Sequence, residues 1–137
     1  MYRGTASLTG VSKSKLSPAL KPLWTFKAQE GIHSTAAIAG GKVYVGCDDG
    51  HLYTLDFKTG KKLWSFKTED IVESSPLVDN GRVYFGSSDG FVYALSAKDG
   101  KLLWKFETED RVLGAPNLFQ PSGGEAKPAL IVGSYDF

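Results

Sequence analysis

The chain has 137 residues and carries 16 basic and 15 acidic side chains, which give a formal net charge of +1. Such a length supports one domain with a sizeable core, and the balanced charge gives no indication of a nucleic-acid or anionic-membrane partner. No apolar run approaches the roughly 20 residues that a membrane-spanning helix needs. The single cysteine excludes an intrachain disulfide and leaves the cellular compartment open.

Residues 1–20 are rich in Ser, Thr, Lys and Gly and show no clear hydrophobic period, so we expect an irregular N-terminal arm. The first residues are not followed by the apolar segment of a signal peptide. A chain that starts at an internal methionine of a longer protein would share this feature, so it does not decide the compartment.

The rest of the chain is organised around an internal repeat, in which tryptophan recurs at intervals of 40 residues. Residues 56–70 recur as residues 96–110 in the same register, and residues 21–27 form an earlier partial copy. A repeat of this period is a signal of the whole fold and outweighs local propensity. Segments with the pattern V-Y-V-G or a close variant lie at 43–46, 83–86 and 130–133, and we attribute the seven-residue displacement of the last one to a loop insertion at 121–127.

In the second unit, short apolar runs alternate with turn signals. Asn-Gly and Asp-Gly pairs between the runs supply the positive φ angles that tight hairpin turns need. Both faces of the runs carry apolar side chains, as in Val83, Tyr84 and Phe85. A sheet with two apolar faces is expected to lie between two other sheets. We expect strands at residues 74–78, 82–86, 91–95 and 101–107.

Four-stranded antiparallel sheets repeated every 40 residues, apolar on both faces, are typical of β-propeller blades. The predicted fold class is therefore all-β. Three units do not close a ring of about four to eight blades, so we expect an incomplete propeller, a fragment whose open faces favour self-association. The alternative is that the tryptophans fill ordinary sandwich cores. The predicted units are a tryptophan strand at 21–27, blades at 32–67 and 72–107, and a partial blade at 112–137.

Residues 54–64 and 94–104 resemble the tryptophan-docking motif A-x-D-x-x-T-G-K-x-x-W of pyrroloquinoline quinone (PQQ)-like propeller repeats. The departures from the motif are Thr54, Ser96 and Asp99. The resemblance implies that a glycine takes the strained turn position before the outer strand and that the tryptophan stacks between blades. The residues that carry this structural motif are Gly60, Trp64, Gly100 and Trp104, with Trp24 in the partial copy.

Antiparallel blades place alternate turns on opposite faces, and this predicts two rims of opposite charge. We hypothesise that the acidic rim docks a cation or a basic partner; the alternative is that its residues are solvated and serve turn chemistry only. The acidic rim comprises Glu30, Asp48, Asp49, Glu69, Asp70, Asp89, Glu109, Asp110 and Asp136. The opposite rim comprises Lys42, Lys58, Lys61, Lys62, Arg82, Lys98 and Lys101, together with Asp56, Asp79 and Asp99.

The spacing of chemically active residues completes no catalytic or metal-binding set. The repeated Thr-Glu-Asp at 68–70 and 108–110 supplies adjacent carboxylates without a further ligand, so we expect it to be structural. His33 and His51 are far from the spacing of metal ligands and are expected to be surface or strand residues. Cys47 precedes two aspartates, which favour a raised pKa and argue against a nucleophile.

The resemblance implies a non-catalytic protein-interaction scaffold, similar to the outer-membrane assembly lipoprotein family, whose partners are other proteins or the remaining blades of the same propeller. One alternative is the N-terminal part of a PQQ-dependent dehydrogenase, which would use PQQ and calcium; another is a ligand-sensing propeller fused to another domain. Such dehydrogenases hold the quinone with adjacent cysteines, which this chain lacks, so no catalytic residue is assigned and enzymatic activity stays undecided. Relatives are mostly exported, which favours a periplasmic or extracellular location.

Overall fold

The computed structural model describes residues 18–119, 121 and 127–136. These residues form β-strands and no helix, so this part of the chain has no helical segment long and apolar enough to cross a membrane. Residues 1–17 of the arm expected at 1–20 lie outside the described residues. So do residues 122–126 of the insertion expected at 121–127. The strands are β1 (Ala37–Ala39), β2 (Lys42–Gly46), β3 (His51–Asp56), β4 (Lys62–Lys67), β5 (Leu77–Asp79), β6 (Arg82–Gly86), β7 (Phe91–Ser96), β8 (Leu102–Glu107), β9 (Asn117–Phe119) and β10 (Ala129–Ile131).

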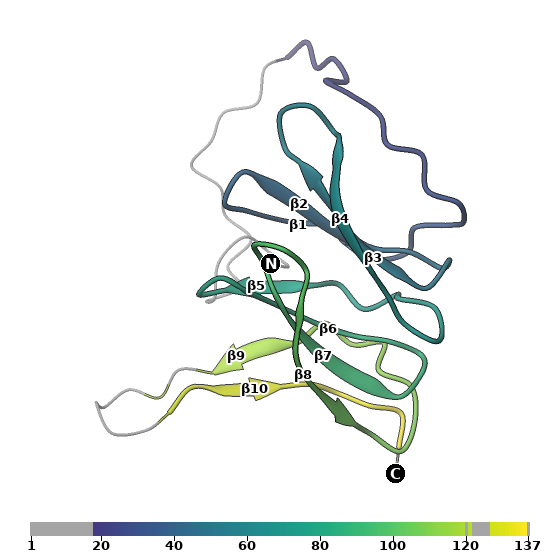
Figure 1. Ribbon diagram of the computed structural model, residues 1–137, viewed down its shortest axis with the longest axis vertical. Coiled ribbons are helices and arrows are strands. Elements are labelled where there is room, and N and C mark those ends of the chain that lie inside the picture. The colour runs from purple at the N-terminus through teal and green to yellow at the C-terminus, as the bar shows by residue number, and fades with distance from the viewer. Residues whose placement is uncertain (1–17, 120, 122–126, 137) are drawn as a thin grey trace.

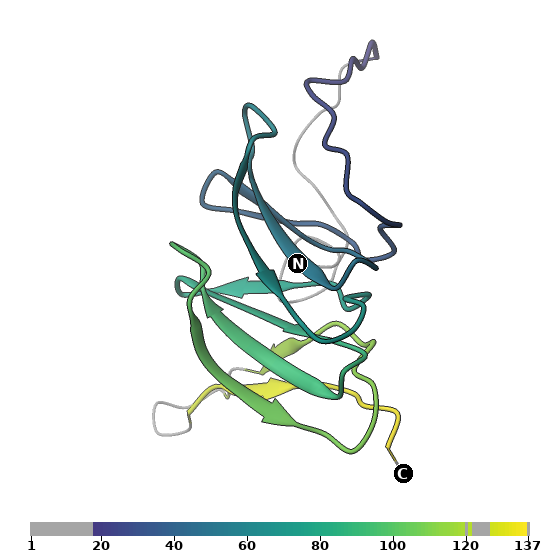
Figure 2. The same cartoon turned by 45° about the vertical axis from the view of Figure 1, so that its right-hand side comes forward.

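The strands form two four-stranded sheets, in the orders β1-β2-β3-β4 and β5-β6-β7-β8, and a two-stranded sheet of β9 and β10. All strand pairs are antiparallel. The three sheets follow one another along the long axis of the molecule, each facing the next (Figures 1 and 2). This arrangement confirms the all-β prediction and gives an open arc of propeller blades.

The two four-stranded blades repeat one another down to the register of their strands. Lys42 pairs with Asp56 in the first blade, and Arg82 pairs with Ser96 in the second, a shift of 40 residues on both strands. The β5–β6 hairpin turns at Asn80 and Gly81, both with positive φ, as a tight two-residue turn requires. The sequence signals therefore fix both the turns and the pairing.

The central strands of each blade are buried on both faces. Residues 43–46 of β2 and 83–86 of β6 are all buried, so apolar side chains of both parities meet a neighbouring sheet. One cluster joins Tyr44 and Leu52 of the first blade to Phe85 and Leu95 of the second. Because the core lies between blades as well as within them, each blade depends on the next one for burial of its apolar face.

The structure corrects two expected strands. Strand β5 begins at Leu77 and not at residue 74, because Pro76 has no N–H for the ladder and the Ser74 hydroxyl donates to the Gly114 carbonyl at 2.8 Å. Residues 21–27 form no strand, because among the described residues no strand precedes them with which they could pair. Trp24 and Phe26 of this segment nevertheless pack on the apolar cluster of the first blade.

Candidate functional site

Each tryptophan that the next blade covers lies directly on a turn glycine. A Cβ atom at Gly100 would lie 2.6 Å from Cε3 of Trp64, and one at Gly60 would lie 2.5 Å from Cδ2 of Trp24. Both glycines have positive φ, at 74° and 70°. The indole and the glycine are thus in contact at a separation that leaves no room for any other residue at the turn.

The two indole N–H groups differ in their partners. Trp24 Nε1 donates to the Phe57 carbonyl at 2.9 Å, whereas Trp64 Nε1 is buried with no hydrogen-bond partner. The equivalent carbonyl in the second blade, that of Ala97, accepts from Lys42 Nζ at 2.6 Å. Lys42 therefore ties the first blade to the second, and it takes the acceptor that the repeat would offer to the indole.

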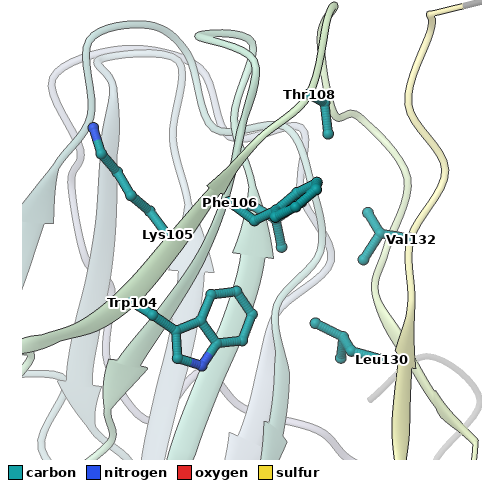
Figure 3. Close-up of a pocket in the computed structure, with 7 residues that line it drawn as sticks. Trp104, Lys105, Phe106, Thr108, Leu130 and Val132 are labelled. Carbon is teal, nitrogen blue, oxygen red and sulfur yellow. The ribbon is translucent and has the colours of Figure 1, made fainter.

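The third tryptophan lines an apolar groove. Trp104 and Phe106 of β8 point toward Leu130 of β10 and toward Val132 across a groove of about 510 Å³ (Figure 3). Trp104 is 40% exposed and Phe106 is 65% exposed. In the first blade the equivalent Phe66 packs on the second blade, with its ring 5.5 Å from that of Tyr93. The groove is thus a blade-to-blade contact of which β9 and β10 cover only one part.

The aspartate directly before the turn glycine, Asp49 in the first blade and Asp89 in the second, does not behave as a free surface charge. Asp49 accepts the hydroxyl of Tyr53 at 2.6 Å and the backbone N–H of His51 at 3.0 Å. Although burial alone would raise the pKa of Asp49, hydrogen bonds led by the one from Tyr53 outweigh it and lower the pKa below its usual value. Asp89 repeats the pattern, with the Tyr93 hydroxyl at 2.7 Å. Burial and the aspartate raise the pKa of both tyrosines, burial being the larger cause.

The exposed acids of the rim include the pairs Glu69–Asp70 and Glu109–Asp110, which occupy the same positions of adjacent blades, together with Glu30 and Asp136. Two cations that the sequence analysis did not include lie among them. Lys67 Nζ donates to the Asp49 carbonyl at 2.7 Å, and Arg111 Nε lies 3.7 Å from Asp110 Oδ1. The rim therefore presents exposed carboxylate pairs interrupted by basic side chains, and whether it docks a partner stays a proposal.

His51 lies in β3 and His33 is exposed, as expected, but His33 also has acidic neighbours. Its Nδ1 lies 2.8 Å from Asp48 Oδ2, and Glu73 lies close enough for all three ligand atoms to fall within 4.8 Å of one another. His51 also has a carboxylate neighbour, since its Nδ1 lies 3.1 Å from Asp49 Oδ1. Linear spacing could not reveal the first group, because it joins two repeat units across the link between their blades.

Cys47 is fully buried, and its Sγ donates to the Gly31 carbonyl at 3.3 Å. Its pKa is raised, as the sequence analysis expected, but the largest cause is burial and the neighbouring Asp49 is a smaller one. A buried thiol with a raised pKa is a poor nucleophile.

Trp104 and Phe106 could not be recognised as groove residues from the sequence, because the motif predicts the same environment for the tryptophan of every copy.

The stacked antiparallel sheets, with tryptophans seated on the turn glycines of the following blade, define a PQQ-like β-propeller repeat protein. Residues 15–124 match the family described as "Outer membrane protein assembly factor BamB". The chain belongs to this family.

Solved structures of similar fold include a BamB protein and an alcohol dehydrogenase. BamB from Moraxella catarrhalis has a TM-score of 0.67 at 25% identity, and the match covers 82% of this chain and 34% of that one. The quinohemoprotein alcohol dehydrogenase from Comamonas testosteroni has a TM-score of 0.60 at 26% identity, covering 66% of this chain and 16% of the enzyme. Sqt1 from Saccharomyces cerevisiae, at 22% identity with a TM-score of 0.66 and covering 75% and 28% of the two chains, shares the fold alone.

A sequence relative, the "Uncharacterized protein MJECL23" of Methanocaldococcus jannaschii, is 48% identical over 40 residues, which cover 29% of this chain and 5% of that protein. The matched stretch has the length of one repeat unit. The chain thus spans about a third or less of the length of each of these relatives.

Proposed function

We propose that this chain is a non-catalytic PQQ-like propeller module that acts as a protein-interaction scaffold. The observation that carries the proposal is the exposure of Trp104 and Phe106 side by side on β8. At the same positions of the first blade, Trp64 and Phe66 pack against the second blade. Removing a side chain of this size from water contributes about 1.5–3 kcal/mol when its burial is complete, so the groove favours association with a further protein surface.

The groove suits one kind of protein segment, a β-strand followed by a turn that contains glycine. In the contact between the first two blades, Phe66 lies against Tyr93 of strand β7, and Trp64 lies on the turn glycine that follows that strand, Gly100. The partner we propose for Trp104 and Phe106 is therefore a blade of the same type. The exposed carboxylate pairs at the rim add a secondary attraction for basic protein segments.

The family description, which names an assembly factor for outer membrane proteins, supports a role in holding protein partners. It also favours a periplasmic or extracellular location for this chain, as the resemblance of its motifs does. For this chain, the role in holding protein partners and the periplasmic or extracellular location are parts of the proposal, because the chain covers only 34% of the BamB structure that it matches.

A peptide with the sequence of residues 91–103 tests the groove. It contains strand β7 and the turn glycine Gly100 but no tryptophan, so the emission of the chain reports binding without interference. We expect saturable binding with a blue shift of tryptophan emission, because the indole of Trp104 leaves water. The same peptide with Gly100→Val should bind weakly, since a side chain at this position meets the indole in the contact between the first two blades.

Two variants of the chain distinguish the groove from general stickiness. Phe106→Glu places a charge in the groove, whereas Leu103→Glu places one on the neighbouring part of β8, outside the residues that line the groove. Leu103 is 49% exposed and is therefore a matched apolar surface residue. We expect Phe106→Glu to abolish peptide binding and to reduce the self-association of the chain in light scattering, while Leu103→Glu changes neither. Equal effects of the two variants, or no peptide binding by the unaltered chain, would refute the proposal.

The likeness to quinohemoprotein alcohol dehydrogenase favours one other function, the N-terminal part of a PQQ-dependent dehydrogenase. The residues of this chain do not fit the quinone, because its one cysteine, Cys47, is buried and the adjacent pair that such enzymes use is lacking. Calorimetry of the full-length protein with PQQ and calcium separates the two functions: binding of both supports the dehydrogenase. A ligand-sensing propeller fused to another domain is a third candidate.

A further inference from the structure

Three side chains with metal-ligating atoms converge between the first two blades. His33 lies in the link that enters β1, Asp48 in the turn between β2 and β3, and Glu73 in the link between β4 and β5. His33 Nδ1 lies 2.8 Å from Asp48 Oδ2, and the three ligand atoms lie within 4.8 Å of one another. The group contains an imidazole as well as carboxylates, and it joins one blade to the next.

The backbone fixes this convergence. The Asp48 N–H donates to the Gly31 carbonyl at 2.9 Å, so the turn is held against the link that carries His33. The Val72 N–H donates to the Cys47 carbonyl at 3.0 Å, which holds the residue before Glu73 against the same turn. The ligands therefore sit on segments that are hydrogen-bonded to one another, and little ordering is needed on binding.

A further bond joins the two links directly. The Thr35 N–H donates to the hydroxyl of Ser75 at 2.8 Å. Thr35 and Ser75 are 40 residues apart, as are His33 and Glu73, so the repeat itself places equivalent positions of adjacent blades side by side.

The state of the Asp48 carboxylate is consistent with a bound cation, and Ser88 Oγ at the equivalent position of the second blade is also buried without a partner. Asp48 Oδ1 is buried from solvent and has no hydrogen-bond partner. Burying a carboxylate oxygen without compensation costs free energy, and such a group calls for an explanation, of which a bound ion is one. The other oxygen of the same carboxylate faces His33, and a Cβ atom at Gly31 would lie 2.9 Å from it, so the glycine leaves this oxygen accessible.

We propose that His33, Asp48 and Glu73 bind a divalent transition-metal ion that joins the first blade to the second. One imidazole nitrogen with two carboxylates suits zinc or manganese, whereas calcium prefers oxygen ligands alone. Neighbouring ligand atoms at about 2.1 Å from a tetrahedral zinc ion lie about 3.4 Å apart, so the hydrogen-bonded His33 Nδ1 and Asp48 Oδ2, now 2.8 Å apart, separate by about 0.6 Å when the ion takes the place of the proton between them. The His33 side chain is 65% exposed, so water completes the coordination.

The site belongs to the first blade interface and does not repeat. The residue equivalent to His33 in the second unit is Glu73, and the residue equivalent to Asp48 is Ser88. Among the described residues no other group of three such ligands comes together. His51 and Asp49 form a second histidine–carboxylate pair that has no third ligand, and this pair serves as an internal control.

The test is titration of the chain with zinc after treatment with EDTA and dialysis. We expect one Zn²⁺ per chain by calorimetry and a rise of the melting temperature with zinc, because an ion that binds only the folded state stabilises it. His33→Gln and Glu73→Gln should each weaken zinc binding by at least about tenfold and remove most of the zinc-dependent rise. The control variants His51→Gln and Glu69→Gln should bind zinc as the unaltered chain does.

Cobalt gives a readout that does not depend on the stability of the variants. Co²⁺ bound through nitrogen and oxygen should show a visible absorption band that zinc displaces. The absence of saturable zinc binding in the unaltered chain would overturn the proposal, as would equal losses in the ligand variants and the controls. Peptide binding at the Trp104 groove is a separate measurement, so failure of the metal site leaves the proposed scaffold function untouched.

Discussion

The contact between Trp64 and Gly100 yields the sharpest test of how the blades are joined. In Gly100→Ala the added Cβ would lie 2.6, 2.8 and 3.1 Å from three atoms of the Trp64 indole, closer than side chains tolerate. The residue also has a φ of 74°, where an alanine costs about 1–2 kcal/mol. Overpacking of this kind costs a further amount of about 1–3 kcal/mol. The free energy of unfolding should therefore fall by about 2–5 kcal/mol.

Gly81→Ala provides the matched control. Gly81 has the same φ of 74°, but a Cβ there would meet no atom within 4 Å. This variant should lose only the backbone part, about 1–2 kcal/mol. The difference between the two variants, about 1–3 kcal/mol, isolates the contact with the indole from the strain of the turn.

Urea unfolding measured by circular dichroism gives both values, since a domain of this size has a stability of about 5–15 kcal/mol. In a Trp64→Leu background the excess cost of Gly100→Ala should disappear, because the atoms that collide have been removed. Equal losses for Gly100→Ala and Gly81→Ala, or an excess that persists without the indole, would refute the reasoning.

Two further predictions concern buried polar groups of the first blade. Because the pKa of Asp49 is lowered in the folded state, its carboxylate stabilises the fold above the pKa of the unfolded chain, about 3.9, and this contribution is lost as the pH falls through the folded value. Asp49→Asn should therefore lose stability at pH 7 and much less at pH 3 in urea unfolding; a difference that does not depend on pH would contradict this. The Cys47 thiol, fully buried and with a raised pKa, should react with a thiol reagent only as fast as the chain opens, so labelling should accelerate with urea in parallel with unfolding. Labelling of the folded chain at the rate of a free thiol would show that the site is open.

The features that repeat could be predicted from the sequence, because the same strand and turn signals recur at the same positions of each copy. The strand expected at residues 82–86 coincides with β6, and the one expected at 91–95 lies within β7. Apart from the late start of β5, which Pro76 explains, the failure occurs where one copy lacks the neighbour that the others have among the described residues. Residues 21–27 carry the apolar pattern of β4 and β8 but have no strand beside them, so the pattern is present and the pairing is not.

The metal-ligand group shows a second limit of the sequence. An alignment of the repeat units makes His33 and Glu73 equivalent residues of different blades. It therefore gives no sign that the two side chains lie close together in space. Their meeting depends on the rotation from one blade to the next, which brings equivalent positions side by side. Ligand spacing along the chain, the usual sequence signal for a metal site, cannot report a contact of this kind.

The positions that differ between copies are therefore the informative ones. Gly60 and Gly100 are the same in both blades because any blade needs them for its contact with an indole. Lys42, by contrast, reaches the Ala97 carbonyl of the second blade at 2.6 Å. Its equivalent, Arg82, is exposed and lines a separate pocket beside Lys127 and Leu130. His33 and Asp48 likewise meet Glu73 at the first interface only, among the described residues. Residues that are identical in the copies form the blade itself. Residues that differ between copies make contacts that are specific to one blade interface.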